Sequence, residues 1–247
     1  MDARLKGAGV NVNWPNATAL DLGAAGGIHA GVLAARVKRL NAADTEDQHL
    51  RWNGEFVKLL SEKFGRHGFS LPMSRVEFNV TDARQLMYRD EWFDIVVSFN
   101  SFEHIQEPGL ALREIGRVLK HGGVFYTSFD PIWTADTGSH FSHRVPAPWA
   151  HLILSDSEFI SEMTNAGAPP SEIEEFKHAM NRWRLSQFTD LFEDRASAFG
   201  LSLVWMSSWK GVSESTHMNV EYFESLKQRY SEDELLTRGM SAVLLRV

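Results

Sequence analysis

The glycine-rich stretch Thr18–Gly27, TALDLGAAGG, constrains the fold of this chain more than any other segment. A short apolar run ends around Asp21, and an alanine-rich apolar segment follows the glycines over residues 28–37. This order predicts a buried strand, a tight turn and the start of a helix. Glycines allow positive φ angles and a close approach of ligand to backbone, and a helix N-terminus offers free N–H groups. The turn therefore predicts a site for the carboxylate or ribose end of an adenosine-containing cofactor, although a plain strand–helix turn is the alternative.

Composition narrows the class of protein. The 247 residues suffice for one α/β domain with an insertion, and 43% apolar residues suffice for a full core. The chain has no cysteine, which excludes disulfides, thiolate metal sites and a cysteine nucleophile and favours a reducing compartment. Its net charge of -7 argues against broad binding to nucleic-acid phosphates. There is no signal-peptide pattern and no apolar run near the ~20 residues that span a bilayer, so we expect a cytoplasmic protein.

Acidic residues follow the next two predicted strands. A weak second strand ends at Asp44, where a carboxylate can accept hydrogen bonds from both ribose hydroxyls. Capping of the next helix, predicted over residues 47–66, is the alternative role. A third strand over residues 74–80 precedes Asp82, which can accept a hydrogen bond from an adenine amino group or cap a turn.

The most hydrophobic predicted strand covers residues 92–99 and suits a central parallel strand that is buried on both faces. The sequence NSFEHI follows it, so His104 lies beyond the carboxyl end of the strand, where open α/β sheets bind their ligands. A helix over residues 108–120, ended by Gly122, and a fifth strand over residues 124–129 continue the alternation.

From Asp130 to about Met180 the alternation of strands and helices stops. The segment predicts a long ordered loop and then two helices, with capping boxes at Ser155 with Glu158 and at Ser171 with Glu174. Long loops inside a domain usually carry function, so we expect residues 130–180 to face the substrate. Four aromatic side chains of this region either line a substrate pocket or pack in a core: Phe129, Trp133, Phe141 and Trp149.

Regular structure returns after the insertion. Residues 1–17 leave little room for a helical cap before the first strand, whereas the C-terminal part is rich in helices and strands. We expect a helix over 186–199, a strand from Leu201, a helical segment over 219–230, a helix started by Ser231 with Glu234, and a final strand over 240–247. The whole chain, 1–247, is then one domain that contains the insertion.

The order of these motifs resembles a class I S-adenosylmethionine-dependent methyltransferase of the small-molecule, type 11-like kind. ALDLGAAGG resembles the first motif of that family, NAADT the acidic tip of strand two, and VTDA the adenine-binding motif. FDIVVSFNSFEHI with ALREIGRVLKHGG resembles the fourth and fifth motifs. The likeness implies a Rossmann-like, doubly wound α/β fold whose seven-stranded sheet has the order 3-2-1-4-5-7-6, with strand seven antiparallel and a helical and loop insertion after strand five.

The resemblance also implies S-adenosylmethionine (SAM) as the cofactor and gives roles to the first motif. Asp21 and the backbone around Gly23 and Gly27 would hold the methionine end of SAM. The family usually has a glycine where this chain has Ala25, whose methyl group narrows the approach of the cofactor.

Roles at the other strand ends follow from the same resemblance. Asp44 would take the ribose hydroxyls, with Thr45 beside the adenine. Asp82 and Ala83 would meet the adenine amine and ring. The backbone that faces the cofactor amine would belong to Asn100 and Ser101.

Methyl transfer from a sulfonium is an in-line displacement, for which the protein supplies alignment and excludes water. A hydroxyl acceptor gains from a general base, and histidine suits this role. His104 is the first candidate, and His140 or His143 could reach in from the insertion; for His104 a structural role beneath the cofactor is the alternative. We expect O-methylation of a small-molecule or glycan acceptor, and the oligomeric state stays open.

The insertion is also rich in metal-ligand types. Asp130, Asp136, His140, His143 and His151 form a run without the fixed spacing that zinc sites on defined elements show. The sequence therefore predicts no metal site.

Two other functions are alternatives to methyl transfer. An NAD(P)-dependent dehydrogenase on a similar sheet needs G-x-G-x-x-G, but this chain has Gly23, Ala25 and Ile28 at those positions. A catalytically silent relative that serves as a binding or partner module would keep the same acidic residues. The sequence argues against the dehydrogenase and leaves the silent module open.

Overall fold

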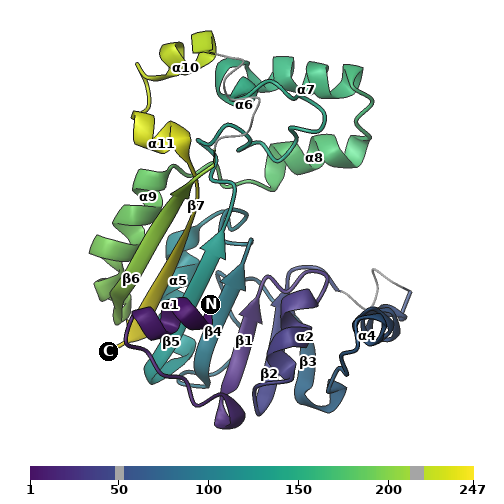
Figure 1. The fold of residues 1–247 in the computed structure, drawn as a ribbon, viewed down its shortest axis with the longest axis vertical. Coiled ribbons are helices and arrows are strands. Elements are labelled where there is room, and N and C mark those ends of the chain that lie inside the picture. The colour runs from purple at the N-terminus through teal and green to yellow at the C-terminus, as the bar shows by residue number, and fades with distance from the viewer. Residues whose placement is uncertain (48–52, 212–219) are drawn as a thin grey trace.

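The computed structural model describes residues 1–47, 53–211 and 220–247, and it contains a seven-stranded sheet in the order β3-β2-β1-β4-β5-β7-β6 (Figure 1). The strands are β1 (Thr18–Leu22), β2 (Arg39–Asp44), β3 (Val76–Val80), β4 (Phe93–Phe99), β5 (Leu119–Phe129), β6 (Leu201–Lys210) and β7 (Thr237–Arg246). β7 runs antiparallel to both of its neighbours, β5 and β6. The predicted sheet order and the antiparallel seventh strand are confirmed.

Helices cover both faces of the sheet and form a lobe beyond one end of it (Figure 1). The helices are α1 (Asp2–Gly7), α2 (Ile28–Ala34), α4 (Phe56–Arg66), α5 (Pro108–Val118), α6 (Ala150–Ile153), α7 (Asp156–Asn165), α8 (Pro170–His178), α9 (Leu185–Asp190), α10 (Val220–Leu226) and α11 (Glu232–Leu236). Short 3₁₀ turns lie at Trp14–Asn16, Met73–Arg75 and Ala196–Phe199, and a π-helical turn at Leu191–Arg195. Among the described residues, none of these helices is both long and apolar enough to cross a bilayer.

The central strands are apolar at nearly every position because each face of the sheet packs against a separate core. Successive side chains of a strand point to opposite faces. Leu20 and Val96 belong to the core beneath α5 and α9, whereas Ala19 and Ile95 belong to the core beneath α1 and α2. This two-sided burial explains the near-continuous apolar run that predicted β4.

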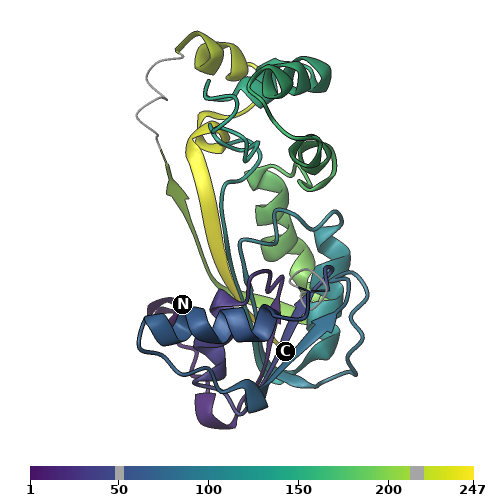
Figure 2. The ribbon, with the colours of Figure 1, turned by 90° about the vertical axis from the view of Figure 1, so that its right-hand side faces the viewer.

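The lobe has a core of its own, built from the insertion together with α10 and α11. The Trp149 ring lies 5.2 Å from that of Phe223, and Trp149 Nε1 donates a hydrogen bond to the Leu235 carbonyl. The four aromatics that the sequence singled out are all buried in cores: Phe129, Trp133, Phe141 and Trp149. Core packing, and not pocket lining, is therefore their role. Figures 1 and 2 show the lobe standing beyond the carboxyl ends of β4 and β5.

The N-terminal segment contains the short helix α1, which has six residues. Arg4 on α1 lies over one face of the sheet and donates hydrogen bonds to Tyr126 Oη and Ser241 Oγ. These bonds join the first helix to β5 and β7.

Several predicted boundaries also move. The helix expected over residues 47–66 is described only as α4, which begins at Phe56; residues 48–52 lie outside the described residues, as does residue 219 of the predicted segment 219–230. α5 ends at Val118 and β5 begins at once, earlier than residue 124.

The predicted capping boxes have mixed outcomes. Those that start with Ser155 and Ser231 are confirmed. The one at Ser171 is wrong, because Pro170 is the first residue of α8 and Ser171 lies inside that helix. Proline favours the first helical position, where its missing N–H would be unpaired anyway.

Candidate functional site

A cleft of about 510 Å³ opens at the carboxyl ends of β1, β2, β3 and β4, with α8 of the lobe at one end. Its volume is in the range of small-molecule sites. Nine residues expected at the site line this cleft: Gly23, Ala25, Asp44, Thr45, Asp82, Ala83, Asn100, Ser101 and His104. The topology thus brings together residues that are spread over four motifs of the sequence.

Four further residues expected at the site lie outside the lining. Asp21 is buried behind the glycine turn, and Gly27 begins α2 at a point where an added Cβ would press on Leu60 of α4. His143 is exposed, with Nε2 3.6 Å from Glu172, and stands apart from the cleft lining. His140 is partly buried beside His104.

The glycine turn is tied to the strands on both sides of β1. The Gly23 and Ala24 N–H groups donate hydrogen bonds of 2.8 and 3.0 Å to the Ala43 carbonyl, and Ser101 Oγ donates to the Gly23 carbonyl. Gly23 has a φ of 80°, and a Cβ there would overlap the Ser101 side chain. Ala25 also takes a positive φ, of 39°, in place of the family's glycine. The backbone here leaves no space for a side chain at Gly23.

Asp44 lies at the end of β2 and closes over the turn. Its two carboxylate oxygens accept hydrogen bonds from the Ala25 N–H at 2.8 Å and the Glu46 N–H at 3.1 Å. An ionised carboxylate offers about four acceptor positions, so about two stay open toward the cleft. Two open positions on one carboxylate suit the two hydroxyls of a ribose.

Asp82 carries a partner that the sequence analysis missed. Arg84 donates to both Asp82 oxygens, with Nη2 at 2.7 Å, and these hydrogen bonds hold the Asp82 pKa below its ordinary value. Arg84 also pairs with Glu107 before α5. The aspartate–arginine spacing of two residues after a strand was the available signal. An adenine amine would share Asp82 with this guanidinium.

Asp21 is a buried carboxyl group beside the cleft. Among the described residues its Oδ2 atom has no hydrogen-bond donor, and burial, aided by the charge of Asp44, raises the pKa of Asp21 to about 7. A cation in the neighbouring cleft would stabilise the ionised form of this buried carboxyl group. The orphaned carboxylate and the acidic lining therefore fit a cofactor that carries a sulfonium and an ammonium group.

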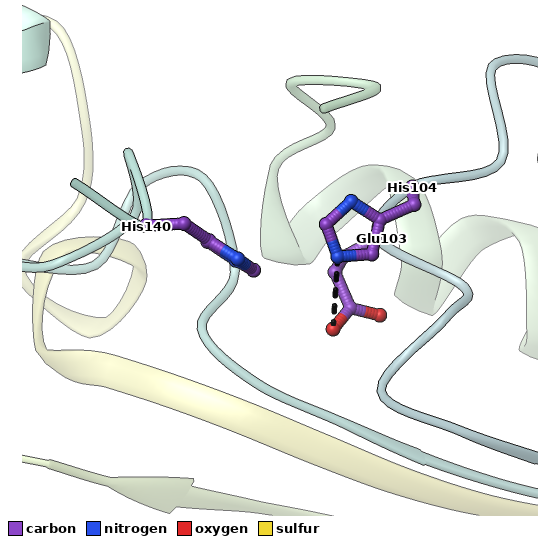
Figure 3. Close-up of side chains that lie close together, drawn as sticks. All are labelled: Glu103, His104 and His140. Carbon is purple, nitrogen blue, oxygen red and sulfur yellow. Dashed lines mark ion pairs between the residues drawn. The ribbon is translucent and has the colours of Figure 1, made fainter. Parts of the chain in front are cut away.

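A second cluster, composed of Glu103, His104 and His140, stands where the cleft meets the insertion (Figure 3). Glu103 and His104 follow β4 in a turn that Asn181 clamps by donating to the carbonyls of Phe102 and Ile105. The rings of His104 and His140 are 5.0 Å apart, and Nε2 of His104 lies 4.0 Å from Oε1 of Glu103. The structure thus joins two histidines from distant segments to a glutamate that the sequence analysis passed over.

Burial sets the charges of this cluster. It lowers the pKa of His104, and together with the neighbouring His104 it lowers that of His140 to about 4. His104 Nδ1 lies 3.0 Å from the Ala179 carbonyl and donates to it, which leaves Nε2 unprotonated. Burial and the charge of Asp130 raise the pKa of Glu103 to about 8, and neither Glu103 oxygen has a hydrogen-bond partner within residues 1–47, 53–211 and 220–247.

Comparison with known proteins agrees with this geometry. Residues 20–127 match the model of a methyltransferase domain family. A proposed methyltransferase of Bacillus halodurans C-125 has a similar structure, with 17% identity, a TM-score of 0.55, and coverage of 99% of this chain and 96% of that protein. A proposed sarcosine dimethylglycine methyltransferase of Galdieria sulphuraria is 16% identical with a TM-score of 0.57, and the match covers 99% of this chain and 83% of that protein.

A third structure contains the cofactor itself. Phosphoethanolamine N-methyltransferase 2 of Haemonchus contortus, in complex with SAM, is 16% identical with a TM-score of 0.55 over 99% of this chain and 51% of that protein. At such identities the structural likeness shows the fold. Residues 20–127 match a methyltransferase domain, and this match supports methyl transfer with SAM as the cofactor.

Proposed function

We propose that this chain is a class I SAM-dependent methyltransferase and that it transfers the methyl group of SAM to an oxygen atom of a small-molecule or glycan acceptor. One observation carries the choice of oxygen: the unprotonated Nε2 of His104 lies on the cleft beside the buried Glu103 and His140. A hydroxyl must lose a proton as it is methylated, and this cluster provides groups that favour that loss.

The cleft residues have separate tasks in holding the cofactor. Asp44 takes the ribose hydroxyls with its open acceptor positions, and Asp82 takes the adenine amine beside Arg84. Asp21, buried behind the turn, supplies negative charge near the methionine end. SAM, when bound, supplies a methyl group made electrophilic by its sulfonium. Alignment and exclusion of water are then the contributions of the protein.

The insertion, residues 130–180, gives the acceptor its place. Glu175 of α8 and Ala179 line the cleft on the side of His104. An acceptor that enters here is held between the lobe and the end of β4. The lobe and the sheet belong to one domain that spans residues 1–247. The absence of cysteine fits a cytoplasmic enzyme.

A labelled-methyl screen tests the acceptor class. With SAM that carries a labelled methyl group, we expect label on hydroxyl-bearing compounds in a panel of sugars, phenols and polyketide-like molecules. Small amines belong in the same panel, because two structural neighbours are named for such acceptors. Label found on nitrogen alone would overturn the choice of oxygen. Tight SAM binding with no labelled acceptor would favour the silent binding module.

Replacing Asp44 by alanine tests the cofactor site. We expect SAM affinity to fall by ~1–3 kcal/mol, because charge-assisted hydrogen bonds to the ribose are lost. Isothermal titration calorimetry measures the change, with Glu77→Ala, an exposed acid on β3, as the matched control. A folded Asp44→Ala protein with unchanged affinity contradicts the placement of the ribose.

A further inference from the structure

Three ligand-type side chains meet at the junction of the cleft and the insertion. Glu103, His104 and His140 each offer one nitrogen or oxygen atom, and these atoms all lie within 4.8 Å of one another. Figure 3 shows the three side chains turned toward one another from two segments of the chain. The set is distinct from the histidine-rich run of the insertion, since it takes His140 alone from that run.

Each histidine of the cluster has one ring nitrogen turned to a backbone carbonyl. His104 Nδ1 lies 3.0 Å from the Ala179 oxygen, and His140 Nε2 lies 3.4 Å from the Pro131 oxygen. A histidine that binds a metal usually donates its other N–H group in this way, which fixes the ring and leaves the ligand nitrogen unprotonated. Both imidazoles are therefore arranged as metal ligands are.

Glu103 is the second, independent sign. Its side chain is 1% exposed, and in the part of the chain that the structure describes neither carboxyl oxygen has a hydrogen-bond partner. Asp130 lies near enough to add negative charge. Burying a carboxyl group without a donor is costly, and a cation bound by both oxygens or one of them removes that cost.

We propose that Glu103, His104 and His140 bind one divalent transition-metal cation of the Zn²⁺ type. Two imidazoles and one carboxylate match the preferences of such ions better than those of Mg²⁺, which favours oxygen ligands. Ligand distances of about 2.0–2.2 Å require the three side chains to draw together by about 1 Å. Three protein ligands leave at least one coordination position open, as in catalytic zinc sites.

The open coordination position of the cation can bind the hydroxyl oxygen of the acceptor. This role of the cation rests on the proposed function. A hydroxyl oxygen bound to the cation loses its proton more easily, because the positive charge stabilises the oxygen anion. Nε2 of His104 is then a metal ligand, and the released proton passes to solvent. Without a cation, Nε2 would accept the proton directly.

Titration of the metal alone tests the site. Zn²⁺ is titrated by calorimetry into chelator-treated full-length protein, as wild type, Glu103→Gln, His140→Ala and the control His121→Ala. His121 is exposed and lies beside Glu91 near the start of β5, whereas the cluster lies beyond the carboxyl end of β4. We expect one tight site per chain in the wild type and the control, and at least 100-fold weaker binding in the two cluster variants. Unchanged SAM affinity and circular dichroism identify variants that fold, and His140→Ala keeps the test valid should Glu103→Gln fail to fold.

The outcomes separate this inference from the proposed function. Equal Zn²⁺ affinity in all four proteins contradicts the site. Full methyl transfer after complete removal of metal contradicts the role of the cation in methyl transfer, and it leaves O-methylation with His104 as direct base. Metal binding that depends on Glu103 and His140 supports the site even where no oxygen acceptor is methylated, and the proposed function then fails alone.

Discussion

Gly23→Ala is expected to lose SAM binding by at least 100-fold and to lower the free energy of unfolding by ~2–4 kcal/mol. The added methyl group would overlap the Ser101 side chain, at a residue whose φ is 80°. Ser101 cannot simply withdraw, because its hydroxyl donates to the Gly23 carbonyl and its backbone closes the end of β4. Calorimetry with SAM and chemical denaturation measure the two effects.

Gly26→Ala is the matched control, since a Cβ there meets no atom within 4 Å. We expect it to change stability by no more than ~0.5 kcal/mol. The double variant Gly23→Ala with Ser101→Gly removes the overlap but keeps the positive φ, so it should recover part of the lost stability. Wild-type SAM affinity in Gly23→Ala would show that the turn does not cradle the cofactor.

Much of the sheet could be predicted because its signals are local. The apolar run of β4, the glycines after β1 and the acids after β2 and β3 each follow from a few neighbouring residues. Parallel strands place their carboxyl ends at one edge, so Asp44 and Asp82 had to meet at the cleft once the strand order was known. The pairing of Arg84 with Asp82 could not be predicted, because it belongs to none of the motifs that the sequence shows.

The lobe and the cluster depend on contacts between distant segments. Trp149 packs against Phe223, and His140 meets His104, across gaps that no local pattern of apolar residues spans. In the sequence Glu103 resembles an ordinary polar residue after a strand, but it is buried in a turn that the distant Asn181 holds by a hydrogen bond to the Phe102 carbonyl. Periodicity predicts which face of an element is buried, but not which segment will bury it.

Asp21→Asn is expected to stabilise the cofactor-free protein while weakening SAM binding. Burial raises the Asp21 pKa to about 7 from 3.8. The unfolded chain ionises this group at lower pH than the folded one, so its contribution to stability is present at low pH and is lost as pH rises from about 4 to 7. Asparagine has no charge to bury. The variant should therefore gain ~2–4 kcal/mol at pH 8 and less at pH 5, as measured by denaturation without SAM.

The same substitution should lower SAM affinity by ~10- to 100-fold at pH 8, because the cationic methionine end loses the negative charge behind the turn. The control is Asp190→Asn, an exposed acid on α9, which should leave both quantities unchanged. A gain in stability with undiminished SAM affinity would mean that the Asp21 charge destabilises the fold and has no role in binding. A loss of stability at pH 8 would mean that contacts stabilise the Asp21 carboxylate by more than its burial destabilises it. A gain in stability together with a loss of SAM affinity is expected only if the Asp21 charge serves binding and destabilises the protein without SAM.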